Sequence, residues 1–305
     1  MRIVSLLPST TEILFAVGAG DEVVGVTFEC DYPPQARSRR IVSTSALSGL
    51  SDPAEIDAEV RARMAAGDDL YHLDEGALAE LVPDLVVTQD LCAVCAVDVS
   101  TVDEALEHLG CDGRVLTIDP GTLDEVLDSV LTIGSATGRW PAADDIVTGL
   151  RRRLARTAQA VVDRPAPRVA VLEWTDPLFC AGHWVPDMVN AAGGESVLGV
   201  PGGRSHVVTP DVIVDASPEV VVVAPCGYDL EGAKALAARL VETGLLPPDL
   251  PVWAVDADAA FVRPGPRLVD GVEALAGLFH PDRVPARPDL VAPVRAGRAP
   301  STLSP

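Results

Sequence analysis

The chain has 305 residues, of which 48% are hydrophobic and 22% are charged, and its formal net charge at pH 7 is −22. This length and apolar content suffice for two globular domains. The acidic excess argues against nucleic acid as a partner, because a phosphate backbone attracts clustered lysine and arginine. No apolar run approaches the roughly 20 residues that cross a bilayer, and residues 1–20 lack signal-peptide features. We therefore expect a soluble cytoplasmic protein without membrane insertion.

The first predicted unit lies in residues 2–20. An apolar run from Ile3 to Leu7 predicts a strand that ends at Pro8. The hydroxyl residues that follow are suited to cap a helix with an acidic residue in its first turn. A strand that leads through a polar loop into a helix N-terminus presents N–H groups to a ligand. The predicted ligand-binding residues of this unit are Ser9, Thr10, Thr11 and Glu12.

Strands and helices alternate through residues 1–120, which predicts a first α/β lobe with a parallel sheet. Its expected strands are Arg2–Leu7, Val23–Thr27, Leu85–Gln89 and Arg114–Ile118. Its expected helices are Thr10–Val17, Pro53–Ala66, Gly76–Leu81 and Val99–Leu109. Residues 121–164 then carry apolar side chains at three- and four-residue spacing, which predicts a long connecting helix that Pro141 ends or bends.

Residues 165–282 predict a second α/β lobe, and residues 283–305, which are rich in Pro, Ala and Arg, a flexible tail. Its expected strands are Val169–Glu173, Val220–Ala224 and Val252–Asp256, and its expected helices lie near Val185–Ala192, Gly232–Thr243 and Gly271–Leu278. The two lobes repeat each other. The segment that begins at Arg2 matches the one that begins at Arg168, and the segment from Val82 matches the one from Ser217.

Five short motifs resemble one known family. They are Ser-Leu-Leu-Pro-Ser-Thr-Thr-Glu (5–12), Glu-Cys-Asp-Tyr-Pro (29–33), Cys-Ala-Val-Cys (92–95), Gly-His-Trp-Val-Pro (182–186) and Arg-Pro-Gly-Pro-Arg (263–267). Up to about His280, the chain resembles the class III substrate-binding proteins of ABC importers, in particular a leaderless group of the vitamin B12-binding branch. The resemblance implies two Rossmann-like lobes joined by a long rigid helix, with a ligand cleft between the lobes. It also implies cobalamin or a related corrinoid as the ligand and an ABC permease as a partner.

The expected cleft is formed by the loops that follow the strands, where ligands of α/β proteins usually sit. These loops hold a large share of the aromatic side chains, which suit a broad, flat, partly apolar ligand such as a tetrapyrrole. The alternative is that the aromatic rings close the cores of the lobes. The aromatic candidates are Trp174, Trp184, Tyr228 and Phe261.

Four of the six cysteines also fall in these loops. In a reducing cytosol a Cys-Xaa-Xaa-Cys pair is more typical of a metal or redox site than of a disulfide. Four thiolates suit zinc or an iron–sulfur cluster. A redox-active dithiol and inert thiols are the alternatives. The candidate metal ligands are Cys30, Cys92, Cys95 and Cys226.

Three further polar residues are candidates for the cleft. The imidazole of His183 suits a metal ligand or an acid–base group, and otherwise it holds its loop by hydrogen bonds. Arg263 and Arg267 flank a rigid Pro-Gly-Pro turn and suit a phosphate, a carboxylate or an amide-bearing rim. They could equally pair with Asp258 or Asp270.

Enzyme signatures are thin, so no catalytic residue is assigned. The sequence has no Walker loop, dinucleotide fingerprint, nucleophile elbow or His-Glu-Xaa-Xaa-His motif. We therefore predict a cytosolic protein that binds cobalamin or a related corrinoid as its small-molecule ligand. Two alternatives stay open: an iron–sulfur or zinc metalloenzyme or redox protein that uses the four cysteines, and the substrate-binding component of an ABC importer.

Overall fold

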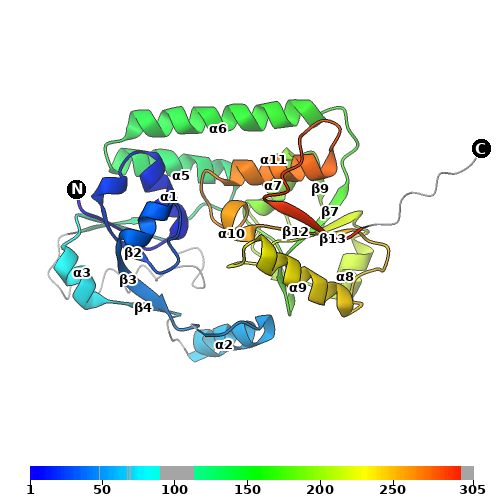
Figure 1. The fold of residues 1–305 in the computed structure, drawn as a ribbon, viewed down its shortest axis with the longest axis horizontal. Helices are drawn as coiled ribbons and strands as arrows, with labels where there is room; N and C mark the ends of the chain where they lie inside the picture. The colour runs from blue at the N-terminus through cyan, green and yellow to red at the C-terminus, as the bar shows by residue number, and fades with distance from the viewer. Residues whose placement is uncertain (48, 67, 69, 90–112, 297–305) are drawn as a thin grey trace, which may run out of the picture. The chain divides into compact units, whose positions relative to one another are not determined.

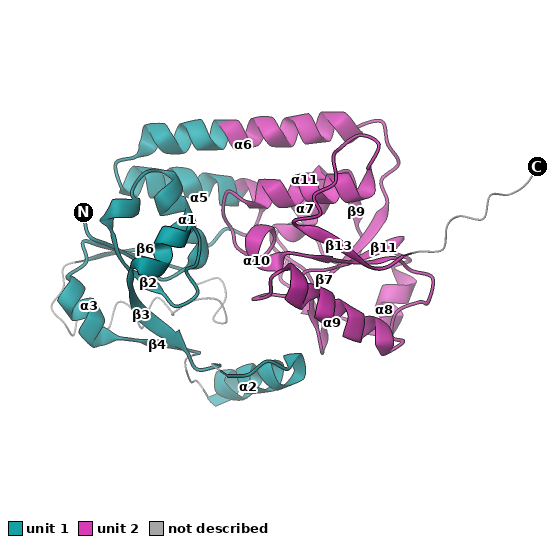
Figure 2. Ribbon diagram, viewed as in Figure 1, with its two compact units in different colours: residues 1–120, 125–148 teal, residues 121–124, 149–305 magenta. Residues whose placement is uncertain are grey.

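The computed structural model of the protein describes residues 1–47, 49–66, 68, 70–89 and 113–296. The predicted helix Val99–Leu109 and the pair Cys92 and Cys95 lie outside these residues. The chain forms two compact units (Figure 2). Unit 1 contains residues 1–120 and 125–148, and unit 2 contains residues 121–124 and 149–305. The boundary between the units falls within the segment 121–164 that was expected to connect two lobes.

Unit 1 is built on a six-stranded sheet with the order β4-β3-β2-β1-β5-β6. Its strands β2, β3 and β4 are labelled in Figure 1. All neighbouring strands are parallel except β4, which runs antiparallel to β3 at one edge. The strands are β1 (Ile3–Ser5), β2 (Val23–Thr27), β3 (Arg40–Ser45), β4 (Tyr71–Leu73), β5 (Leu85–Thr88) and β6 (Arg114–Thr117). The central strands β1 and β5 are buried throughout, as expected for a parallel sheet covered by helices.

Helices α1 and α3 pack on this sheet. Leu78 of α3 shares a hydrophobic core with Val4, Leu6 and Val86. The helices of unit 1 are α1 (Pro8–Ala16), α2 (Pro53–Ala66), α3 (Glu75–Leu81), nearly all of α5 (Leu123–Ala136) and the first part of α6 (Trp140–Val161). The described part of unit 1 also contains two short 3₁₀ helices, η1 (Gly20–Glu22) and η2 (Pro34–Ser38).

Unit 2 is built on a second sheet with the order β10-β8-β7-β11-β12-β13, in which β9 pairs with β7. The central strands β7, β11 and β12 are parallel, and β8, β10 and β13 add antiparallel edges. The strands are β7 (Arg168–Thr175), β8 (Leu178–Cys180), β9 (Glu195–Ser196), β10 (His206–Val207), β11 (Val220–Val223), β12 (Val252–Val255) and β13 (Val291–Arg295).

Helix α9 packs on β12 and β13 of this sheet, and α11 packs on α7. Ala170, Leu172, Val221 and Leu240 belong to a buried core that strands and helices share. The helices of unit 2 are the rest of α6 together with α7 (Val185–Ala191), α8 (Pro210–Asp215), α9 (Leu230–Glu242), α10 (Ala257–Ala260) and α11 (Leu268–Phe279).

The repeat predicted from the sequence has a structural counterpart. In unit 1, β1 pairs in parallel with β5, and in unit 2 β7 pairs in parallel with β11. The N–H of Arg2 donates to the carboxylate of Asp84 (2.6 Å), and the N–H of Arg168 donates to that of Glu219 (2.9 Å). Each unit therefore holds the start of its first strand in the same way.

A second match concerns the backbone just before the later strand of each pair. Val82 and Ser217 both have a positive φ, of 43° and 47°, although neither is glycine. Each precedes a proline and an acidic residue. Because non-glycine residues rarely adopt this conformation, the coincidence supports a duplicated α/β unit more strongly than the valine-rich strands do.

Three expectations about the elements need correction. Helix α1 begins at Pro8, with Leu7 at the N-cap and no side-chain cap, because proline suits the first helical position and needs no N–H partner there. The connecting segment forms two helices, α5 and α6, rather than one, and the break at residues 137–139 lies just before Pro141, which was expected to end or bend the helix. The third is the flexible tail expected at residues 283–305. Val291–Arg295 instead forms an edge strand that pairs with β12. Burial of Leu290 and Val291, and two hydrogen bonds from the Arg295 guanidinium to backbone carbonyls, hold this strand in place.

Candidate functional site

The carboxyl ends of β7, β11 and β12 meet at one edge of the unit 2 sheet, and their loops are tied together there. The N–H of Cys226 donates to the carbonyl of Glu173 (3.2 Å), and the N–H of Asp258 donates to the carbonyl of Tyr228 (3.2 Å). Loops after three parallel strands thus form one continuous surface. This is the position at which α/β proteins usually bind ligands.

Two predicted aromatic residues come together at this edge. The rings of Trp174 and Tyr228 lie 6.1 Å apart at an interplanar angle of 56°, and both residues are half-buried. The indole N–H of Trp174 donates to the carbonyl of Asp176 (3.1 Å), which orients the ring. A tilted aromatic pair of this kind offers an apolar face to a flat ligand.

The other two predicted aromatic residues are buried, so the structure differs here from the expectation of ligand-facing rings. Phe261 is completely buried, and Trp184 is 7% exposed. The indole N–H of Trp184 donates to the backbone carbonyl of Phe261 (2.7 Å). Both rings therefore pack inside unit 2, where they join the loop before α7 to the loop after β12.

His183 has an uncommon backbone conformation, with φ of +52°. This region costs a non-glycine residue about 1–3 kcal/mol, so the surrounding contacts must hold it. Its N–H donates to the carbonyl of Gly203 (2.6 Å), and its carbonyl accepts from the N–H of Gly202 (3.0 Å). Burial, and then the charge of Arg204, lower the pKa of His183, so the imidazole is neutral at pH 7.

The two predicted arginines have contacts within unit 2. The guanidinium of Arg263 lies 3.5 Å from the carboxylate of Asp258, and its side chain is 13% exposed. Arg267 occupies the N-cap of α11, where its carbonyl accepts from the N–H groups of Asp270 and Gly271. The pairing of Arg263 with Asp258 agrees with one of the two alternatives expected from the sequence.

In unit 1 the predicted ligand residues Ser9–Glu12 are buried. The hydroxyl of Thr11 donates to that of Ser5 (2.8 Å), which lies 2.7 Å from the hydroxyl of Thr10. Thr10 also donates to the carbonyl of Leu7 (3.1 Å). These hydroxyls therefore bind one another and the end of β1, and the role of Ser9–Glu12 toward a ligand stays a prediction.

The four predicted metal ligands are described only in part. Cys30 is buried and lies 3.0 Å from the hydroxyl of Thr11, whereas Cys226 is exposed. Within the described residues, no group of three or more His, Cys, Asp and Glu is placed to hold a metal ion. Because Cys92 and Cys95 lie outside those residues, a cysteine-ligated zinc or iron–sulfur cluster stays a prediction.

Two side-chain pairs were missed by the sequence interpretation. In unit 1 the rings of Phe28 and Tyr71 lie 6.3 Å apart, and Phe28 directly follows β2, a position that the rule for strand ends would have found. In unit 2 the thiol of Cys180 lies 3.3 Å from Nδ1 of His206. Burial raises the pKa of Cys180, so it is a neutral thiol at pH 7. No spacing in the sequence signals this second pair.

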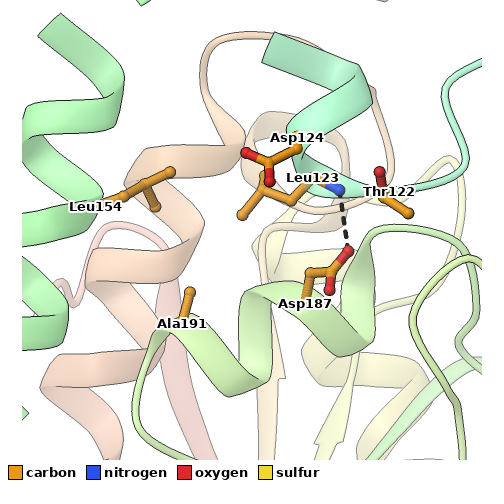
Figure 3. A pocket seen from close by; sticks show the side chains of 6 residues that line it. All are labelled: Thr122, Leu123, Asp124, Leu154, Asp187 and Ala191. Carbon is orange, nitrogen blue, oxygen red and sulfur yellow. Dashed lines mark hydrogen bonds between the residues drawn. The ribbon is translucent and has the colours of Figure 1, made fainter. Parts of the chain in front are cut away.

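Unit 2 also contains a pocket of about 400 Å³ (Figure 3). A carboxylate oxygen of Asp187 on α7 accepts from the N–H of Leu123 (3.1 Å), the first residue of α5. Asp187 thus acts as a cap for a helix N-terminus. The lining residues are Thr122, Leu123, Asp124, Leu154, Asp187 and Ala191. With two carboxylates and no aromatic ring, this pocket does not suit a flat apolar ligand.

Two sheets with parallel central strands, each with its first strands paired in the same way, place the chain among two-unit α/β proteins. The chain belongs to the periplasmic binding protein family, whose sequence pattern matches residues 3–246. Among the described residues, no helix is both long and apolar enough to cross a membrane.

Relatives and solved structures agree with this family. The chain is 28% identical over 293 residues to the ABC transporter substrate-binding lipoprotein YvrC of Bacillus subtilis, and the match covers 92% of this chain and 80% of that protein. It is 26% identical to the cobalamin-binding protein of Halobacterium salinarum, with 92% and 69% covered. The fold is similar to that of a periplasmic heme-binding protein from Pseudomonas aeruginosa, with a TM-score of 0.70, 21% identity, and 98% and 99% covered.

Proposed function

We propose that the protein is the substrate-binding component of an ABC importer and that its ligand is cobalamin or a related corrinoid. The observation that carries the proposal is the contact between Trp174 and Tyr228 at the carboxyl edge of the unit 2 sheet. Membership of the periplasmic binding protein family supports the transport role. The name of the Halobacterium relative supports the corrinoid.

The aromatic pair suits a corrinoid for a physical reason. A corrin ring is broad and apolar on its faces, and burial of an aromatic side chain against such a surface contributes about 1.5–3 kcal/mol. The aromatic rings of Trp174 and Tyr228 are half-buried, so part of their surface is available for a ligand to cover. We expect the corrin to lie against this pair.

Binding of cyanocobalamin to the purified protein, measured by calorimetry, tests the proposal. We expect Trp174→Ala to weaken binding by about 10- to 100-fold, which corresponds to about 1.4–2.8 kcal/mol. Trp140→Ala is the matched control, because Trp140 is an exposed tryptophan at the start of α6 and should leave the affinity unchanged. Absence of binding for cyanocobalamin, cobinamide and heme alike would contradict the proposal, and equal losses in both variants would contradict the assigned surface.

The location of the protein is a separate question, because the sequence predicts the cytoplasm, whereas a substrate-binding component meets its permease outside the cell membrane. Cell fractionation with detection of the native protein decides between them. Recovery with the membrane or extracytoplasmic fraction would favour the importer. Recovery in the cytosol would favour an intracellular corrinoid carrier that uses the same site.

A further inference from the structure

His183 presents its imidazole from a loop that is held on both sides. Backbone hydrogen bonds join it to Gly202 and Gly203, and the N–H of Gly182 donates to the hydroxyl of Ser205 (3.1 Å). A Cβ atom at Gly182 would lie 2.5 Å from the carbonyl oxygen of Gly203, so the two segments could not approach so closely with a larger residue there. These contacts hold a backbone that an unsupported histidine would rarely adopt.

The loop is also joined to the segment that carries Tyr228 through α10, because the N–H of Asp258 in α10 donates to the carbonyl of Tyr228 and Phe261 directly follows α10. The ring of His183 lies 5.7 Å from the ring of Trp184, and Trp184 donates its hydrogen bond to Phe261 in the loop after β12. His183 is half-buried, so part of its ring remains accessible. An accessible imidazole in a fixed position is suited to bind a metal ion, and histidine is the commonest metal ligand in proteins.

We propose that the imidazole of His183 coordinates the central cobalt ion of the bound corrinoid. This inference rests on the proposed function. A ring nitrogen donates its lone pair to Co(III), so that a cobalt–nitrogen bond forms, a cobalt–water bond breaks and one water molecule leaves. No oxidation state changes. The lowered pKa supports the step, because only the neutral imidazole has a lone pair to donate.

The test uses two corrinoids that differ at the metal. In diaquacobinamide both axial positions hold exchangeable water, whereas in dicyanocobinamide both hold cyanide. We expect the full chain to shift the visible spectrum of diaquacobinamide in the way that free imidazole does, and to leave that of dicyanocobinamide unchanged. His183→Gly, which accommodates the positive φ, should abolish the shift and weaken diaquacobinamide binding by about tenfold, and added imidazole should restore the shift.

His206→Ala is the matched control, because His206 is an exposed histidine of the same unit and its loss should leave the shift intact. A shift that survives in His183→Gly, or that disappears only in His206→Ala, would overturn the assignment. If diaquacobinamide is retained on dialysis without any spectral change, coordination is wrong while the proposed function stands. If cyanocobalamin binds but neither cobinamide is retained, coordination is wrong while the proposed function stands. If cyanocobalamin and heme do not bind either, the proposed function fails and this inference fails with it.

Discussion

The protonation of His183 should be visible in the stability of the protein. Burial and the guanidinium of Arg204 lower its pKa in the folded state, whereas the unfolded chain binds the proton with the ordinary pKa of about 6.5. The unfolded state therefore binds more protons as the pH falls below that value, and the folded state is destabilised. Above about pH 6.5 both states are neutral at this residue, and the effect vanishes.

We therefore expect the thermal midpoint of the wild type to fall, relative to that of His183→Gln, as the pH is lowered from about 7.5 to 5.5. Glutamine keeps a polar side chain on the same strained backbone but does not titrate. Other ionisable groups contribute equally to both proteins, so the difference between the two midpoints isolates His183. Parallel curves over this range would contradict the lowered pKa.

At single residues, the sequence predicted positions better than orientations. Trp174 and Tyr228 were found because each lies near the carboxyl end of a strand, Trp174 next to the last residue of β7 and Tyr228 in the loop after β11, and these ends meet at one edge. The same rule selected Phe261, but its side chain turns into the core. Loop position does not determine which way a ring points, because that depends on packing between segments distant in the sequence. The contact of Cys180 with His206 could not be predicted from the sequence for the same reason.

Among the helices of unit 2, an ion cluster joins α6 to α11. The guanidinium of Arg153 donates two hydrogen bonds to the carboxylate of Glu273 (2.9 and 2.7 Å) and one to that of Asp270. The side chains are roughly three-quarters buried, with exposed fractions of 27–29%. A cation that neutralises two partly buried carboxylates leaves a repulsive pair when it is removed.

We expect Arg153→Met, which keeps the apolar stem, to cost about 1–2 kcal/mol and to lower the thermal midpoint by about 2–8 °C. Arg152→Met is the control, because Arg152 is the exposed neighbour on the same helix. Thermal unfolding followed by circular dichroism measures both variants. Equal midpoints for the two would show that the cluster contributes nothing beyond surface charge.

Among the elements, those with strong hydrophobic patterns were predicted well. The strands β2 and β11 agree with expectation closely, because a valine run is a local signal. Helix α2 also has the expected bounds although only Pro53 of it is buried, because alanine, glutamate and arginine are strong helix formers. Strand β3 was missed because only Val42 and Ser43 of its six residues are buried, so no apolar run marks it. Strand β13 was missed because its place depends on pairing with β12, about 40 residues earlier.

For the whole molecule, the repeat and the family comparison support each other. The matched backbone at Val82 and Ser217, and the matched contacts of Arg2 and Arg168, arise within each unit separately. A duplicated α/β unit therefore explains why, in each half, the loops that follow the parallel strands lie at the carboxyl edge of the sheet.

The net charge of −22 should influence how fast a ligand arrives. A strongly negative protein attracts cations over a distance that salt shortens, because the screening length is about 30 Å at 0.01 M and about 3 Å at 1 M ionic strength. Diaquacobinamide is cationic and dicyanocobinamide is neutral. The His183→Gly variant has no imidazole to coordinate cobalt. When the two ligands associate with this variant, they therefore differ only in charge.

We therefore expect the association rate of diaquacobinamide with His183→Gly to fall about tenfold between 0.01 M and 0.5 M salt, and that of dicyanocobinamide to change less than about twofold. Stopped-flow quenching of tryptophan fluorescence measures both rates. The dissociation rates should change little, because the attraction acts before contact. Equal salt dependence for the two ligands would mean that the acidic residues lie too far from the binding edge to guide a ligand toward it.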